Sequence, residues 1–266
     1  MCKKIIFILK NRDKIFSMNW LKNLVGRIYA LYVLIIFIIF MLIFLLPMWL
    51  VSFYSLRIRL RKFVKLGRLW CRLMMPLIGC PVRTKGRENF SPGQAYIIVC
   101  NHNSFMDIPA TYAGIPGTHK SLAKKEMVKT PIFGIMYKIG SVLVDRKDPA
   151  SRKQSFVEMK EVLENGIHML LYPEGTRNKT GQPLKEFYDG AFSLAIDTQK
   201  PILPTVIWGT REILPNSKPF FAWPHAVKME FLPPVSTIGY DIEDVEELKA
   251  KVFKIMWDRY QQGANS

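Results

Sequence analysis

A histidine and an aspartate in the run NHNSFMD, residues 101–107, have the types and the spacing needed for proton transfer. His102 and Asp107 can meet if the loop turns into a helix behind the histidine. The carboxylate then holds one imidazole nitrogen and fixes the tautomer, so the other nitrogen is free to take a proton from a hydroxyl. The competing interpretation is a structural histidine beside an aspartate that caps a helix.

The sequence offers no nucleophile of its own to accompany this pair. It has no Gly-x-Ser-x-Gly elbow. Its four cysteines form neither a close Cys-x-x-Cys pair nor a metal-finger spacing with histidine. We interpret them as reduced thiols in a chain whose working part faces the cytosol. We therefore expect the substrate's own hydroxyl to be the nucleophile.

Three further motifs follow or open apolar runs. In YPEGTR, residues 172–177, a proline and a glycine force a tight turn that exposes backbone N–H groups, and Arg177 offers a fork suited to phosphate or carboxylate. The run GSVLVDR ends at Arg146, and PILP occupies residues 201–204. Taken singly, each motif has a simpler interpretation. YPEGTR could be a turn with a surface salt bridge, GSVLVDR could end in a surface Asp–Arg pair, and PILP could merely mark the start of a strand.

The four motifs together are far more specific than any one of them. Their contents, order and spacing resemble the four blocks of the glycerolipid acyltransferase family, which contains the 1-acyl-glycerol-3-phosphate acyltransferases. The resemblance covers about residues 81–231, and the pair NHNSFMD and YPEGTR in this order is its strongest part.

The resemblance implies a role for each matching residue. His102 would be the general base on the acceptor hydroxyl, and Asp107 would be its orienting partner. Gly175 would lie close to the reacting thioester, where its backbone N–H could help to stabilise the oxyanion. Substrate binding would fall to Gly175 and to four further residues of the second and third blocks: Arg146, Glu174, Thr176 and Arg177.

The resemblance also implies the substrates. The donor would be a fatty acyl thioester on coenzyme A or acyl carrier protein, attacked directly by the hydroxyl of a lysolipid with no acyl-enzyme, no cofactor and no metal. We expect 1-acylglycerol-3-phosphate as the acceptor and phosphatidic acid as the product. One departure weakens this choice. Many bacterial members carry basic residues within a Phe-x-x-Gly stretch where this chain has Tyr188 and Asp189, preceded by Lys185 and Glu186. A lyso-aminolipid, such as a singly acylated ornithine or glycine lipid, is therefore the alternative acceptor.

The elements that must position these motifs alternate along the chain. Short β-branched runs predict strands at 95–100, 141–144, 167–172, 202–208 and 227–231. Longer patterns predict helices at 124–139, 149–164, 189–198 and 245–257. This alternation indicates an α/β fold with a mixed sheet flanked by helices. Three motifs directly follow predicted strands, so we expect them on one rim of the sheet.

The N-terminal part predicts a membrane anchor over residues 1–75, followed by a catalytic domain over residues 76–266. Residues 28–56 carry no charge and would form a helix roughly 44 Å long, more than the ~30 Å of a bilayer core. Pro47 lies inside this run. Basic residues flank it on both sides, so charge cannot choose between a helix that spans and one that dips into a single leaflet. Residues 57–75 read as a basic amphipathic helix at the interface.

The charge balance indicates an anionic partner. The chain has 38 Lys and Arg against 21 Asp and Glu, a formal net charge of +17, which attracts nucleic acid, anionic lipid or a phosphorylated substrate. The basic residues cluster beside the apolar run, which favours membrane lipid over nucleic acid. We expect a cell (inner) membrane location with the catalytic domain on the cytoplasmic side. Competing classes are a non-enzymatic membrane-tethered lipid-binding protein, a nucleic-acid binder and a His/Asp hydrolase.

Overall fold

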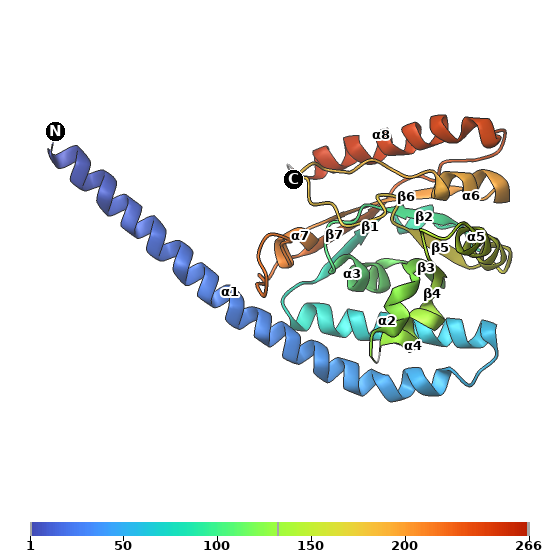
Figure 1. Cartoon of the computed structure of the whole chain (residues 1–266), viewed down its shortest axis with the longest axis horizontal. Helices are drawn as coiled ribbons and strands as arrows, with labels where there is room; N and C mark the ends of the chain where they lie inside the picture. The colour runs from blue at the N-terminus through green and yellow to red at the C-terminus, as the bar shows by residue number, and fades with distance from the viewer. Residues whose placement is uncertain (1, 132, 265–266) are drawn as a thin grey trace.

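The computed structural model describes residues 2–131 and 133–264, and a mixed sheet lies at its centre (Figure 1). The strand order is β1-β7-β6-β2-β5-β3-β4. The five strands from β6 to β4 are mutually parallel, β7 is antiparallel to β6, and β1 is parallel to β7. The strands are β1 Val82–Lys85, β2 Ile97–Cys100, β3 His119–Lys124, β4 Ser141–Val144, β5 His168–Leu171, β6 Ile202–Trp208 and β7 Val227–Phe231. The predicted α/β fold with a mixed sheet is confirmed.

Helices cover both faces of this sheet. On one face α5 contacts α6, and α6 contacts α8; α3 and α4 lie on the other face (Figure 1). Their bounds are α3 Asp107–Gly114, α4 Phe133–Gly140, α5 Pro149–Glu164, α6 Gly190–Thr198, α7 Thr210–Ile213 and α8 Val245–Ala264. Three short 3₁₀ helices connect elements: η1 Arg87–Asn89, η2 Lys125–Lys129 and η3 Ile242–Asp244.

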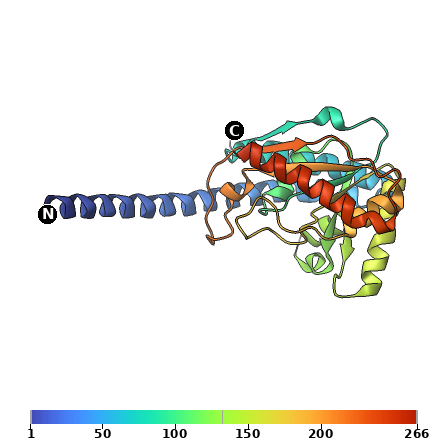
Figure 2. The same cartoon turned by 90° about the horizontal axis from the view of Figure 1, so that it is seen from above.

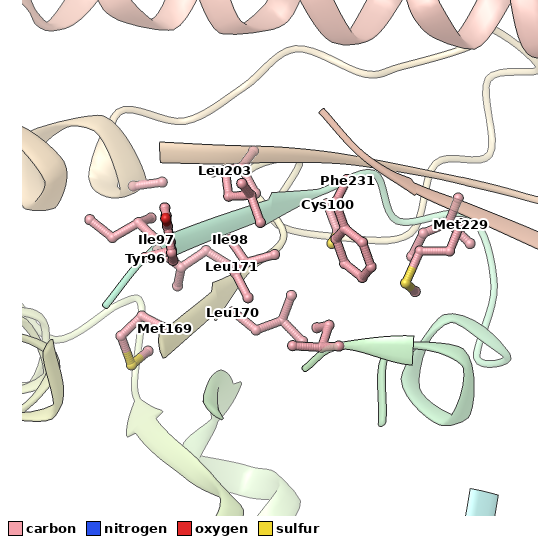
Figure 3. Packing of buried hydrophobic residues seen from close by; sticks show 14 of the residues in the cluster. Tyr96, Ile97, Ile98, Cys100, Met169, Leu170, Leu171, Leu203, Met229 and Phe231 are labelled. Atoms are coloured by element: carbon pink, nitrogen blue, oxygen red, sulfur yellow. The ribbon is translucent and has the colours of Figure 1, made fainter. Parts of the chain in front are cut away.

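The core lies around the three central strands. Every residue of β2, β5 and β6 is buried, as expected of parallel strands covered on both faces, which read as continuous apolar runs. Figure 3 shows Ile98, Leu170 and Leu203 packed in this layer. The packing fixes the ends of these strands, and so it fixes the start of each loop that leaves them.

Two strands escaped the sequence analysis, and one predicted helix is shorter than expected. The strands β1 and β3 read VRTK and HKSLAK, whose basic residues hide the apolar pattern of a strand. The predicted helix 124–139 is η2 followed by α4. Thr130 between them is extended, because a residue before a proline, here Pro131, avoids the helical conformation. Residue 132 of that prediction lies outside the described residues.

The N-terminal part forms two long antiparallel helices, α1 Cys2–Val51 and α2 Leu56–Leu77. Helix α1 continues through Pro47 and extends well past the rest of the molecule (Figures 1 and 2). The chain leaves the helix after Val51, so the apolar helix ends five residues earlier than the predicted 28–56. Its segment Trp20–Val51 is long and apolar enough to cross a membrane, by length and composition alone.

The apolar face of α2 packs on protein. Phe63, Val64 and Met75 are buried, and the helix lies against α1, α3 and α4. Two of its basic residues are also bonded to protein: Arg68 donates to the carbonyl of Ile115 and Arg72 to that of Ala113 (2.9 and 3.0 Å). Cations stabilise the C-terminal end of a helix in this way. Part of the apolar surface of residues 57–75 therefore packs on α3 and its neighbours, while Leu69 and Leu73 remain exposed.

Candidate active site

The sequence motifs converge on one edge of the sheet. NHNSFMD follows β2, Arg146 follows β4 and YPEGTR follows β5, and the three strands are parallel. The carboxyl ends of parallel strands meet at the same edge, so the structure confirms the predicted common rim. Asn101 ties this edge to β6, because its side chain donates to the carbonyl of Ile207 (2.9 Å) and accepts from its N–H (2.7 Å).

His102 and Asp107 form a hydrogen-bonded pair at this edge. Nδ1 of His102 lies 2.8 Å from Oδ2 of Asp107. The same oxygen accepts the backbone N–H groups of Asn103 and Ser104 at 2.7 and 2.8 Å, because the loop curls around the first residue of α3. A carboxylate can only accept, so Nδ1 carries the hydrogen. Nε2 is then an acceptor, and it has no hydrogen-bond partner among the described residues.

Tyr172 sets the plane of the imidazole, a contact that the sequence analysis did not predict. Its ring stacks on that of His102 with centroids 4.3 Å apart and planes 26° from parallel. Burial raises the pKa of the Tyr172 phenol well above its usual value, so the phenol stays protonated and cannot compete as a base. Its position as the first residue of YPEGTR was the only signal that could have pointed to it.

Glu174 holds the backbone of the loop that carries His102. Its side chain is completely buried. One carboxyl oxygen accepts the backbone N–H of His102 (2.8 Å) and the other accepts that of Lys185 (3.0 Å). Burial raises the pKa of this carboxyl to about 7, opposed by the two backbone hydrogen bonds. Glu174 is expected from the sequence to shape the acceptor site; in the structure its carboxyl holds the backbone of His102.

Gly175 adopts a conformation that favours glycine, with φ at +69°. A Cβ here would lie 2.7 Å from the ring of Tyr188 and 3.0 Å from the guanidinium of Arg146. Arg146 donates to the carbonyl of Gly175. The N–H of Gly175 donates to the carbonyl of Tyr172 at 3.0 Å. That N–H is therefore engaged within its own turn in this structure, and its expected part in stabilising an oxyanion stays a prediction.

Three cations lie at the YPEGTR turn, which follows β5 at the same edge of the sheet as His102. The guanidinium carbon of Arg177 lies 3.7 Å from the ring centroid of Phe105, and the ammonium of Lys185 donates to the hydroxyl of Thr176 (3.2 Å). The third cation is Arg146. Among the described residues, none of the three forms an ion pair with a carboxylate. Unpaired Arg and Lys side chains of this kind can bind a phosphate.

The remaining reactive groups lie outside this arrangement. Cys71, Cys80 and Cys100 are buried free thiols, and burial raises the pKa of Cys71 to about 12, which leaves it protonated and inert. In the part of the chain that the structure describes, no three His, Cys, Asp or Glu side chains gather where they could hold a metal ion. The arrangement can therefore remove a proton from a hydroxyl beside a bound anion.

Known proteins are similar to this chain in sequence. A model of the acyltransferase family matches residues 81–208. The chain is 31% identical over 189 residues to the 1-acyl-sn-glycerol-3-phosphate acyltransferase of Cocos nucifera, covering 70% of this chain and 60% of that protein. It is 30% identical over 191 residues to the human 1-acyl-sn-glycerol-3-phosphate acyltransferase alpha, covering 71% and 67%. The chain thus spans about three fifths of the coconut protein's length.

A solved structure has the same architecture. The crystal structure of the 1-acyl-sn-glycerophosphate (LPA) acyltransferase PlsC from Thermotoga maritima superposes with a TM-score of 0.71 at 25% identity. The match covers 92% of this chain and 98% of that one, so it extends beyond the sheet to the N-terminal helices.

Proposed function

The chain belongs to the acyltransferase family that contains the 1-acyl-sn-glycerol-3-phosphate acyltransferases, and we propose that it acylates the free hydroxyl of 1-acylglycerol-3-phosphate to give phosphatidic acid. The observation that carries this proposal is the His102–Asp107 pair, whose Nε2 has no hydrogen-bond partner among the described residues. Arg146 and Lys185 bind the turn of residues 172–177, Arg177 lies within it, and none of the three forms an ion pair with a carboxylate among the described residues. The pair supplies a base, and the cations supply a seat for the phosphate of the acceptor.

The proposed reaction is a direct transfer between two bound substrates. Nε2 of His102 takes the proton of the acceptor hydroxyl while that oxygen attacks the thioester carbonyl. Asp107 holds the Nδ1–H and stabilises the imidazolium. The tetrahedral intermediate then expels the thiolate, which takes the proton from His102. The ester forms as the thioester breaks, the proton ends on the thiol, and no group of the protein is acylated.

Lys185 bears on the choice of acceptor. The stretch from Phe187 to Gly190 lacks the basic residues common in bacterial relatives, which favoured a lyso-aminolipid as the alternative. The ammonium of Lys185 donates to the hydroxyl of Thr176, within the turn of the third block. It offers positive charge close to Arg146 and Arg177 in sequence blocks two and three, which supports the phosphate-bearing acceptor.

We propose an acyl thioester of coenzyme A or acyl carrier protein as the donor. Both carriers are anionic, and the chain's formal net charge is +17, so long-range attraction would favour their approach. No separate cofactor and no nucleic acid enters this scheme.

The proposed location is the cell (inner) membrane, with the active site on the cytoplasmic side and residues 1–75 as the anchor. Three contacts favour α1 dipping into one leaflet over spanning both. The ring of Phe221 covers Gly26, Tyr32 donates to the carbonyl of Leu77 (2.9 Å), and Met48 is buried. A helix with one side held on α2 and on Phe221 at several points along its apolar segment is not surrounded by bilayer there, which supports a dipping arrangement.

An acyl-transfer assay on the full chain tests the proposed function. Wild type and His102→Ala are compared with acyl-CoA and acyl carrier protein donors, and with lysophosphatidic acid and lyso-aminolipid acceptors. Wild type should acylate lysophosphatidic acid, and His102→Ala should lower kcat by a factor of about a hundred or more, since general-base catalysis is lost. Lys153→Ala, a change on the exposed side of α5, is the control and should behave as wild type.

Three other results of this assay would change or refute the proposal. Transfer to the aminolipid alone would keep the mechanism and replace the acceptor. Near-normal turnover by His102→Ala would refute the mechanism. A wild-type protein that acylates neither acceptor with either donor would count against the proposed function.

A further inference from the structure

Asn216 connects the first and third sequence blocks although it belongs to neither. It lies in the loop between α7 and β7, beyond the residues 81–208 that match the family model. Its side-chain amide donates to the carbonyl of Asn103 (2.9 Å) and to that of Asn178 (3.4 Å), and accepts from Nη1 of Arg177 (3.1 Å). The partners fix the orientation of the amide, because a guanidinium only donates and a carbonyl only accepts.

The backbone atoms that Asn216 holds are those beside the general base. Asn103 follows His102 directly. Asn178 follows Arg177, and its N–H donates to the carbonyl of His102 at 2.6 Å. One side chain thus joins the loop of the general base to the loop of the arginine, so the spacing between these two groups depends on residue 216.

Arg177 is oriented from two sides and remains available to an anion. Phe105 lies against the face of its guanidinium, 3.7 Å from the ring centroid to the guanidinium carbon, and the Oδ1 of Asn216 takes one of its N–H groups. A guanidinium has five N–H donors, and this is its one hydrogen bond among the described residues. A neutral amide orients the arginine without cancelling its charge, which an aspartate at the same place would do.

We infer that Asn216 is a positioning residue for acyl transfer, which sets the guanidinium of Arg177 relative to Nε2 of His102 so that an acceptor bound through its phosphate presents its hydroxyl to the base. The inference rests on the proposed function for the identity of the acceptor. Nothing in the sequence pattern of the four blocks points to this residue.

Steady-state kinetics with lysophosphatidic acid test the inference on Asn216→Ala, Asn216→Asp, Arg177→Ala and the double variant Asn216→Asp/Arg177→Ala. Asn216→Asp should raise the acceptor KM about tenfold, because its carboxylate pairs with Arg177 and competes with phosphate. Asn216→Ala, which loses the orientation but keeps the free charge, should raise KM less. In the Arg177→Ala background, Asn216→Asp should raise KM much less than it does in the wild type, since the ion pair that it introduces has lost its partner.

The control is Asn165→Asp, the same chemical change at an exposed residue where α5 ends, on the edge of the sheet away from the site; it should leave kcat and KM unchanged. A purely structural role for Asn216 predicts loss of thermal stability with equal KM for the Ala and Asp variants. Equal KM values, or effects of the two substitutions that simply add, would overturn the inference.

A binding measurement distinguishes a failure of this inference from a failure of the proposed function. The His102→Ala protein turns over slowly and keeps the proposed phosphate site, so its titration with lysophosphatidic acid without an acyl donor reports binding alone. Weaker binding after adding Asn216→Asp supports the inference even if the wild type proves to acylate another lysolipid, and unchanged binding overturns it even if the wild type acylates lysophosphatidic acid.

Discussion

One oxygen of Asp107 organises the chemistry at the scale of single residues. Oδ2 accepts three N–H groups, from the ring of His102 and from the backbones of Asn103 and Ser104. The side chain is fully buried, and a buried charge is tolerated only when it is hydrogen-bonded. The same bonds that make the carboxylate tolerable also fix its direction, and so they fix the tautomer of the histidine.

Replacing Asp107 by Asn should separate the effect of the carboxylate charge from that of the side chain's shape. The amide is nearly the same shape, but it is neutral and cannot stabilise the imidazolium, and its NH₂ can impose the wrong tautomer on His102. We expect kcat to fall by a factor of about a hundred to ten thousand, with the acceptor KM changing less than threefold. Steady-state kinetics beside circular dichroism check this. Unchanged turnover in a folded variant would remove Asp107 from the catalytic pair.

At the scale of elements, α2 supports the helix that begins at the catalytic aspartate. Helix α3 starts at Asp107, and its C-terminal carbonyls receive N–H groups from Arg68 and Arg72 of α2. Helix α2 also buries Phe63 and Met75 in the core. Helix α2 therefore contributes to the same core as the sheet, and the predicted boundary at residue 75 lies within this helix.

Two truncations should differ sharply because of this packing. Removal of residues 1–75 takes away several buried side chains, each contributing roughly 2–5 kcal/mol, against a total stability of about 5–15 kcal/mol. That protein should not fold. Removal of residues 1–19 leaves every described side-chain contact of α1 with the domain and should keep both fold and activity. Thermal melts and acyl transfer in detergent test both. A cooperative melt of the 76–266 protein would contradict this assignment of α2.

At the scale of the whole molecule, the two edges of the sheet have different electrostatics. The active site occupies the edge where β2, β4 and β5 end. His119 and His168 begin β3 and β5 at the other edge, in register with one another. Both histidines are buried near Arg68. The ring centroids of Tyr112 and His119 lie 5.1 Å apart. Burial, and then the charge of Arg68, lower the pKa of His168 to about 4; burial is likewise the first cause that lowers the pKa of His119 to about 3.

These histidines should make the fold sensitive to acid. Both are neutral when folded but take up a proton near pH 6.5 when unfolded, so the unfolded state binds more protons below that pH. The unfolding free energy should fall between pH 6.5 and about 3–4, by at most about 1.4 kcal/mol per pH unit for each group. Glu174 acts oppositely: its pKa of about 7 against a usual 4.5 stabilises the fold as pH falls from 7 to 4.5.

The variant His119→Phe isolates one contribution. Neither ring nitrogen of His119 has a hydrogen-bond partner among the described residues, so the substitution sacrifices no hydrogen bond there. Its melting temperature should drop less than that of the wild type between pH 7 and pH 5, with Glu174 common to both proteins. Parallel pH dependences in differential scanning calorimetry would show that His119 does not contribute.

The sequence by itself determined the family and most of the scaffold. The blocks placed His102 and Asp107 after a strand, and the apolar runs predicted β4, β6, β7 and α5 at their observed bounds. These features are local: a strand or helix pattern and a short loop are specified by neighbouring residues. The strands β1 and β3 were not predicted, because their lysines and arginines mask the alternation on which such predictions depend.

Only the tertiary structure decided what each side chain touches. Glu174 bonds to a backbone N–H 72 positions away, and Asn216 to a carbonyl 113 positions away. The N–H of Gly175 donates to the carbonyl of Tyr172, and α2 packs on α3. The reason is physical. Hydrophobic periodicity specifies which side of an element is buried, but the partner that buries it depends on how distant elements pack.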